Sequence, residues 1–280
     1  MKLIVNVDDL GLHPAVTRAV LEGAEKGIIT SASVLANGGD IDHVAKLGAN
    51  GVLGSLSLGA HLNILRGVPM IRPDKIPSLV GDDGLFLGSY TKLFNRYLLG
   101  RLDLEEVELE FRAQIGKLRS LGIELSHLDS EKHVHAWPGL MRLVRYVAGQ
   151  EGISWVRRPI EPTLPLDWSK NALKARLLSI WCGHHAPNDI SSTDAVWGIV
   201  DQGTPSAPRF ERRLAAYSGA EIVEAIIHPG LPKPGDPPMP RGYESMTASQ
   251  RWRSESCSIL DGGWPDMLRA NGIVLTNFCQ

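Results

Sequence analysis

Short apolar runs alternate with segments of helical periodicity along most of this 280-residue chain. The first run, residues 2–7, ends at two aspartates, and Pro14 then opens a stretch of apolar residues at helical spacing that Gly27 stops. A strand, a turn, a helix and a second strand in this order form the βαβ pattern of a parallel sheet. The predicted strands are residues 2–7, 28–36, 52–58, 126–135, 153–157, 196–199, 221–227 and 273–276. Further helices are predicted near residues 41–47 and over residues 104–121, 138–149, 173–181, 210–217 and 247–259.

The predicted strands are apolar enough for a sheet that is buried on both faces, as in a barrel or an open doubly wound sheet. Polar clusters favour the barrel, because each falls where a predicted strand ends. These clusters are Asp8-Asp9, His61, residues 127–135, Arg157-Arg158 and His228. In a barrel the carboxyl ends of all strands meet at one face. We therefore expect a TIM-barrel-like α/β fold, a (β/α) barrel of about seven parallel strands.

The length of the chain predicts a single domain over residues 1–280, because no repeat or low-complexity linker divides the sequence. Residues 66–88 are rich in Pro, Gly and Asp and have weak periodicity, which predicts a long insertion loop with the composition of a lid.

Charge and cysteine usage narrow the class of protein. The formal net charge is −2 with no long run of one sign, which is not typical of a nucleic-acid-binding protein. The N-terminal apolar run meets two aspartates by residue 9, so it is expected to be neither a secretory signal nor a membrane span. Three widely spaced cysteines favour a reducing, cytoplasmic compartment over a disulfide framework. The Pro-rich segment 229–240 permits a homodimer.

The segment SHLDSEKHVH, residues 126–135, has the highest density of metal-ligating side chains. His127, Asp129, Glu131, His133 and His135 all stand at odd positions, so in an extended strand all five would point to one face. Imidazole and carboxylate are the ligands of zinc and of other divalent first-row metals. The spacing favours metal or acid–base chemistry; the alternative is a surface strand that runs into a polar turn.

Asp8 and Asp9 are adjacent carboxylates at a strand end, where like charges resist joint ionisation unless a cation lies between them or one pKa rises. One aspartate could bind a metal while the other accepts a proton from water; alternatively, the pair caps the following helix. His61 in GAHLNI and His228 in IIHPG also follow apolar strands, and each alone is compatible with a structural role.

Two other polar clusters can be explained without a function. Residues 182–185, Cys-Gly-His-His, have no second cluster at zinc spacing and are interpreted as a loop. Arg157-Arg158 is compatible with steering of an anionic or carbonyl substrate and with a salt-bridged rim.

An ordered set of motifs spans most of the chain. It comprises VNVDDLG near the N-terminus, GIITSASVLANGGDIDHVAKL (Gly27 to Leu47), GAHLNI, SHLDSEKHVH, STDAVWGI (Ser192 to Ile199), IIHPG and the segment Arg251 to Glu255 after Tyr243. In this set the chain resembles the YdjC-like (ChbG/HpnK) carbohydrate deacetylases. The resemblance implies a barrel of the NodB/YdjC deacetylase type that uses a divalent metal ion to remove an N-acetyl group from an acetylated sugar.

By position, the resemblance implies that Asp9 and His61 are metal ligands, that Asp8 is the base, and that His228 is the acid or a transition-state stabiliser. The family usually has a metal-binding histidine where this chain has Glu131. Because glutamate also binds zinc or magnesium, Asp9, His61 and Glu131 form the expected ligand set, which would favour a harder ion than a two-histidine site. His133 is the alternative third ligand, and a degenerate site is the other possibility. Substrate contacts are expected from His127, His133, Arg158 and Asp194.

Three functions follow as hypotheses. The first is a Zn- or Mg-dependent deacetylase in which Asp8 takes a proton from water and His228 protonates the departing amine of an N-acetylated glucosamine-type sugar. The second is a metal-dependent hydrolase or lyase of another bond, for which a Gly-rich phosphate cradle is missing. The third is a non-catalytic carbohydrate-binding protein that lost the chemistry through Glu131.

Overall fold

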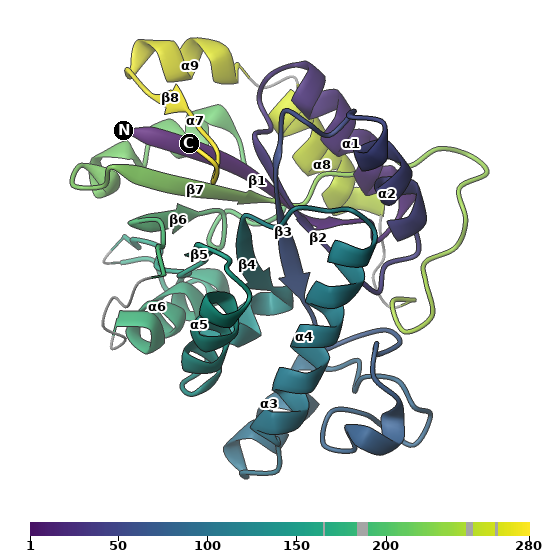
Figure 1. Ribbon diagram of the computed structural model, residues 1–280. Helices are drawn as coiled ribbons and strands as arrows, with labels where there is room; N and C mark the ends of the chain where they lie inside the picture. The colour runs from purple at the N-terminus through teal and green to yellow at the C-terminus, as the bar shows by residue number, and fades with distance from the viewer. Residues whose placement is uncertain (165, 184–189, 245–248, 261–262) are drawn as a thin grey trace.

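Parallel strands form a strongly curled sheet in the computed structural model, which describes residues 1–164, 166–183, 190–244, 249–260 and 263–280 (Figure 1). The strands are β1 (Lys2–Leu10), β2 (Ser31–Val34), β3 (Ser57–Leu62), β4 (His127–Ser130), β5 (Trp155–Val156), β6 (Ala195–Trp197), β7 (Ile222–Ile227) and β8 (Val274–Leu275). Their order is β5-β4-β3-β2-β1-β7-β6, and β8 pairs with β1 outside this path.

The two ends of the curled sheet, β5 and β6, approach each other through backbone hydrogen bonds. The Val156 N–H donates to the carbonyl of Ser191 at 2.9 Å, and the Val196 N–H donates to the carbonyl of Ile160 at the same distance. Every described strand pair is parallel. The prediction of a TIM-barrel-like α/β fold is therefore confirmed, with a sheet that curls as a half-barrel and is joined only by isolated bonds at its seam.

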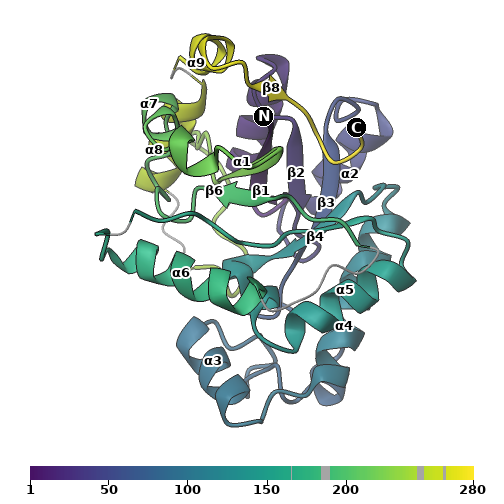
Figure 2. The same ribbon diagram turned by 90° about the vertical axis from the view of Figure 1, so that its left-hand side faces the viewer.

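Helices surround the outside of the sheet (Figures 1 and 2). They are α1 (Pro14–Glu25), α2 (Ile41–Ala49), α3 (Tyr90–Leu98), α4 (Leu104–Ser120), α5 (Leu140–Gln150), α6 (Lys170–Gly183), α7 (Ala207–Glu211), α8 (Ser249–Leu260) and α9 (Trp264–Ala270), with 3-10 turns η1 (Pro73–Lys75), η2 (Glu131–Ala136) and η3 (Leu214–Tyr217). α1 begins where predicted, because Pro14 occupies its first turn and the His13 side chain accepts the Ala15 N–H. Among the described residues, no helix has the length and hydropathy that crossing a membrane requires.

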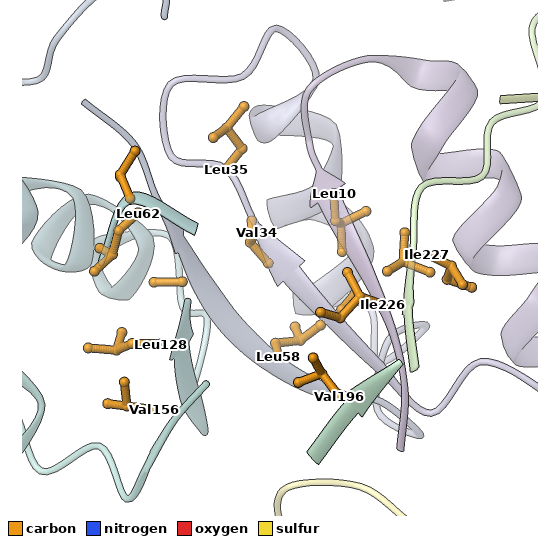
Figure 3. Close-up of a cluster of buried hydrophobic side chains, with 14 of the residues drawn as sticks. Leu10, Val34, Leu35, Leu58, Leu62, Leu128, Val156, Val196, Ile226 and Ile227 are labelled. Carbon is orange, nitrogen blue, oxygen red and sulfur yellow. The ribbon is translucent and has the colours of Figure 1, made fainter. Parts of the chain in front are cut away.

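The core lies on both faces of the sheet, because nearly every strand residue is buried. Figure 3 shows apolar side chains from several strands gathered in one cluster, among them Leu10, Leu62, Leu128 and Ile226. Both faces of the strands are covered, so polar strand residues such as Ser31, Ser33 and Asn6 are buried as well.

Some predicted elements differ from those observed. Residues 52–56 form turns, and β3 begins at Ser57; Leu53 and Leu56 are buried from turns that the Gly51 carbonyl closes by accepting the Gly54 N–H. The helix predicted over residues 210–217 is divided into α7 and η3. The pattern also missed α3 and α9, which are short and begin shortly after Gly88 and Gly263.

Residues 66–88 are largely irregular, and α4 anchors them. Buried Glu110 accepts the Met70 and Ile71 N–H groups, each at 2.9 Å, and Glu106 accepts the Ser78 N–H at 2.7 Å. Both ribbon views place this segment and α3 beyond one end of the sheet (Figures 1 and 2). The loop is therefore tied to the barrel by side chains of a helix that follows it in sequence.

Candidate active site

Asp8 and Asp9 lie at the carboxyl end of β1, inside the strand and not after it as predicted. The register of β1 against β2 shifts between Val7 and Leu10, and Asp9 has a φ of 67°, a left-handed conformation that costs energy for a residue other than glycine. Both aspartates are buried with different neighbours although they are consecutive, and the irregularity of the strand permits this. In a regular strand their side chains would point to opposite faces of the sheet.

Arg157, which follows β5, is the centre of a buried cluster of carboxylates. Its guanidinium donates to both oxygens of Asp8, at 2.9 and 2.7 Å, and to Glu224 from Nε at 2.9 Å and Nη2 at 2.6 Å. Nη2 also lies 2.6 Å from Asp129. Burial alone would raise the pKa of Asp8, but Arg157 and nearby His61 outweigh it and hold that pKa well below its usual range. Asp8 is therefore a fixed, ionised carboxylate.

His61 in β3 lies between two carboxylates. Its Nδ1 donates to Asp129 at 2.7 Å, and its Nε2 lies 3.4 Å from Asp9. Burial opposes the imidazolium, but Asp129 and Asp8 overcome this and raise the pKa of His61 to about 10. Ser33 also donates to Asp129 at 2.7 Å, so the carboxylate that orients the imidazole is itself held. A carboxylate behind a histidine in this way fixes the nitrogen that remains for a metal ion.

The prediction that five polar residues of segment 126–135 share one strand face is wrong. β4 ends at Ser130, and the chain enters η2, in which Lys132 and His133 have φ values of 55° and 58°. His135 consequently lies behind the site, bonded to Ser130 Oγ at 2.5 Å and to the Arg157 carbonyl at 2.9 Å. Two left-handed residues in succession are a tertiary feature that an alternating pattern does not reveal.

Glu131 and His133 have different surroundings. Burial raises the pKa of Glu131 to about 7, and the charges that act on it include Arg66, Asp9 and His61. Burial lowers the pKa of His133 well below its usual range, and the cations Lys174 and Arg157 add to this effect. The charges that act on Glu131 are therefore of both signs, whereas those that lower the pKa of His133 are cationic.

His228 follows β7 and faces Asp8. Its Nε2 lies 3.7 Å from Asp8 Oδ2 and its Nδ1 lies 3.8 Å from Glu255, whose carboxylate accepts the His228 backbone N–H at 2.5 Å. The side chain is 23% exposed, so it is the accessible member of the pair with Asp8. Burial would lower the pKa of His228, but Glu255 and Asp8 raise it.

In the part of the chain that the structure describes, one group of side chains brings possible metal-ligand atoms together. Among the described residues, ligand atoms of Asp8, His61 and Asp129 lie within 4.8 Å of one another. Arg157 already occupies both carboxylates of that group, so a cation there would have to displace a guanidinium. Of the expected group, Asp9 lies 3.4 Å from His61 Nε2, the ring nitrogen that does not face Asp129, and the charges of Asp9 and His61 act on Glu131. Asp9, His61 and Glu131 together do not form a group of described residues whose ligand atoms all lie within 4.8 Å of one another.

Three predicted substrate contacts are not brought to the centre of the site. His127 is 0% exposed, bonds Ser33 and Ser126 through its ring nitrogens, and stacks on Phe278 with centroids 4.0 Å apart. Asp194 lies before β6 at the amino ends of the strands, where Oδ2 accepts the N–H groups of residues 221 and 222. Arg158 donates to the Cys182 carbonyl at 3.4 Å.

Three residues that build the site were not assigned roles from the sequence: Arg66, Glu224 and Glu255. One of them left a visible signal, because Glu224 interrupts the apolar run of β7 and a buried carboxylate requires a cationic partner. The loop interpretation of residues 182–185 is wrong for Cys182 and Gly183, which end α6, and His184 and His185 lie outside the described residues.

Comparison with known proteins identifies relatives with carbohydrate chemistry. The family model described as "YdjC-like protein" matches residues 2–268. A chitooligosaccharide deacetylase of Serratia marcescens is 31% identical over 232 residues, which cover 82% of this chain and 81% of that protein. A carbohydrate deacetylase of Brevibacillus brevis is 34% identical over 148 residues, which cover 53% of this chain and 56% of that protein. The match thus spans little more than half the length of that relative.

The fold has a counterpart among solved structures. A protein from Enterococcus faecalis V583, provisionally described as a cellobiose-phosphate cleavage protein, superimposes with a TM-score of 0.74. The match covers 99% of this chain and 97% of that chain at 22% identity, so it shows a shared fold.

Proposed function

Because the chain belongs to the YdjC-like protein family, we propose that it is a metal-dependent carbohydrate deacetylase. The proposed substrate is a sugar or oligosaccharide of the glucosamine type, from which the enzyme hydrolyses an N-acetyl group. The structural observation that carries the proposal is the approach of His228 to Asp8 at 3.7 Å, beside His61 and Asp9, at one end of the barrel. A hydrolase needs this arrangement of a proton acceptor, a proton donor and possible metal ligands.

Asp9, His61 and Glu131 are the side chains that would hold a divalent ion. They provide one imidazole and two carboxylates, a donor set suited to zinc or magnesium. Neither carboxylate oxygen of Glu131 has a hydrogen bond among the described residues, although both are buried, and the cation beside Oε1 is Arg66 at 3.0 Å. A bound divalent ion supplies polarisation of the amide carbonyl and a lower pKa for water.

Asp8 is the proposed proton acceptor. Arg157 keeps it ionised and fixes both of its oxygens, so it is always in the form that can take a proton. In the reaction, oxygen from water adds to the acyl carbon while a proton passes to Asp8. The ion pair with Arg157 also makes Asp8 a weaker base. Asp8 can therefore accept a proton only from a water molecule whose pKa is lower than that of bulk water.

His228 is the proposed proton donor. Its pKa is raised, so a larger fraction carries a proton at neutral pH than in an unperturbed histidine. When the carbon–nitrogen bond breaks, the amine leaves with a proton from His228, and acetate and an amino sugar are released. Glu255 supports this role by pairing with the ring and by accepting the His228 N–H.

The remaining assignments extend the proposal. We place His133 and Arg158 at the edge of the substrate site and retain a single domain with residues 66–88 as its insertion. A cytoplasmic location is supported by three cysteines that are free. A homodimer stays a prediction that sedimentation would test.

Elemental analysis of the purified protein and an acetate-release assay on N-acetylglucosamine oligomers test the function. The proposal expects stoichiometric metal, acetate release that a chelator abolishes, loss of metal in Glu131→Ala and retention in Glu131→His. Sugar binding without acetate release, after loading with Zn²⁺ or Mg²⁺, would instead support the carbohydrate-binding alternative. Unchanged metal content in Glu131→Ala would move the third ligand to another residue, such as His133.

A further inference from the structure

Two arginines are bound to carboxylates of the site, and their bonding differs sharply. Arg157 is 0% exposed and makes four hydrogen bonds to Asp8 and Glu224 from its three guanidinium nitrogens. Arg66 lies 3.0 Å from Glu131 through Nη1, with side-chain exposures of 15% and 7%. Yet neither Glu131 oxygen, nor Nε of Arg66, has a hydrogen bond among the described residues. The Arg66–Glu131 pair thus joins opposite charges but lacks the aligned hydrogen bonds that make such pairs strong.

The backbone of Arg66 is held by several hydrogen bonds, whereas the described contact of its side chain is the ion pair with Glu131. Asn63 Oδ1 accepts the Arg66 N–H at 3.2 Å, and the Arg66 carbonyl accepts from Asn63 at 2.7 Å and from Asn37 at 3.0 Å. Gln114 in turn binds both the N–H and the carbonyl of Asn63. These hydrogen bonds fix the backbone of Arg66. Its long side chain can therefore change direction without moving the loop.

From this contrast we infer that Arg66 is an exchangeable counter-ion of Glu131, which a divalent cation displaces when it binds. The inference rests on the proposed function, since it concerns the same third ligand. Burying the Glu131 carboxylate without a cationic partner costs free energy, so the metal-free protein needs Arg66 as that partner. In the metal-loaded protein the divalent ion takes this role, and it repels a guanidinium on the same carboxylate.

Arg66 therefore lowers the affinity of the site for metal and makes the bound ion easier to exchange. Replacing it with a neutral residue should tighten metal binding and destabilise the metal-free protein. Arg72 offers a matched control, because it lies in the same loop and pairs with Asp74 at 2.6 Å, but both side chains are exposed at 75% and 57%.

The test measures Zn²⁺ affinity by chelator competition in the full chain, independently of acetate release. Arg66→Ala and Arg66→Gln should each bind Zn²⁺ about tenfold or more tightly than the wild type. Arg72→Ala should bind like the wild type, and Arg66→Gln should gain nothing when Glu131→Gln is also present. Equal or weaker Zn²⁺ affinity in both neutral variants would overturn the inference. If Arg66→Ala does not fold, Arg66→Gln alone decides.

The outcomes separate this inference from the proposed function. Tight Zn²⁺ binding that is indifferent to Arg66 overturns the inference and leaves the deacetylase proposal intact. Gain of binding in Arg66→Gln supports the inference even if no acetate is released. Absence of Zn²⁺ binding in the wild type and in every Arg66 variant overturns both.

Discussion

Arg157 binds Asp8 with two parallel hydrogen bonds, Nη1 to Oδ2 at 2.9 Å and Nη2 to Oδ1 at 2.7 Å. The two residues are 149 positions apart in the sequence and neither side chain is more than 2% exposed. A fork of this kind fixes the plane of the carboxylate as well as its charge. The orientation of the proposed base is therefore set from the opposite side of the barrel.

Replacing Arg157 should cost more stability than any other single change at the site. Arg157→Ala leaves Asp8, Asp129 and Glu224 buried near one another without their cation, which should reduce the free energy of unfolding by about 3–5 kcal/mol. Arg157→Lys should recover only part of this, because one ammonium cannot reproduce the fork. Chemical denaturation measures the change, with Arg158→Ala as the neighbouring control. A loss below about 1 kcal/mol in Arg157→Ala would contradict the central role of this guanidinium.

The pH dependence of activity should report the pairing of His228 with Glu255. Because Glu255 raises the pKa of His228, the protonated donor persists above the ordinary range, and activity should fall only as pH rises through this raised value. Glu255→Gln keeps an acceptor for the backbone N–H but removes the charge. The alkaline limb of kcat/KM should then move to lower pH while the acidic limb stays. An unchanged alkaline limb would mean that another group donates the proton.

Metal binding should release a proton from His61. In the metal-free protein its pKa is about 10, so at pH 8 the imidazole is protonated, and Nε2 must lose its proton before it can act as a ligand. Calorimetry at pH 8 in buffers of different ionisation enthalpy should show close to one proton released per ion, and affinity should rise with pH up to about 10. Binding without proton release would remove His61 from the ligand set.

Asp194 should matter for stability and not for turnover. Its carboxylate accepts the N–H groups of Glu221 and Ile222 at the amino ends of the strands, 2.8 and 2.9 Å away. Asp194→Ala should lower the free energy of unfolding by about 1 kcal/mol. kcat/KM for acetate release should be unchanged. A selective rise in KM without loss of stability would restore the substrate contact predicted from the sequence.

The sequence was sufficient for the architecture because each local signal agreed with the fold. Apolar runs flanked by Pro14 or Gly27 marked strands and helices whose ends lie within a few residues of those observed. The placement of polar residues at strand ends also identified a barrel, since Asp8, His61 and His228 do meet in space. Periodicity failed at residues 52–56, where Leu53 and Leu56 are buried from turns.

The charged partners of the site could not be predicted in the same way. Arg66 reaches Glu131 because Asn63 and Gln114 hold its loop, and no local pattern encodes that contact. The left-handed residues Lys132 and His133 are likewise imposed by tertiary packing. The strand predicted through His135 therefore ends at Ser130 instead.

The position of β1 in the sheet has a consequence for synthesis of the chain. β1 precedes the other strands in the chain, yet one of its edges pairs with β7, and residues 2 and 3 of the other edge pair with β8. Both edges therefore stay partly unpaired until these late strands have been made. Asp8 likewise has no partner in Arg157 or His228 until those residues have been synthesised. A nascent chain that stalls before β7 would carry a bare apolar strand edge, which is prone to aggregation. Truncation should therefore yield a client for chaperones rather than a smaller enzyme.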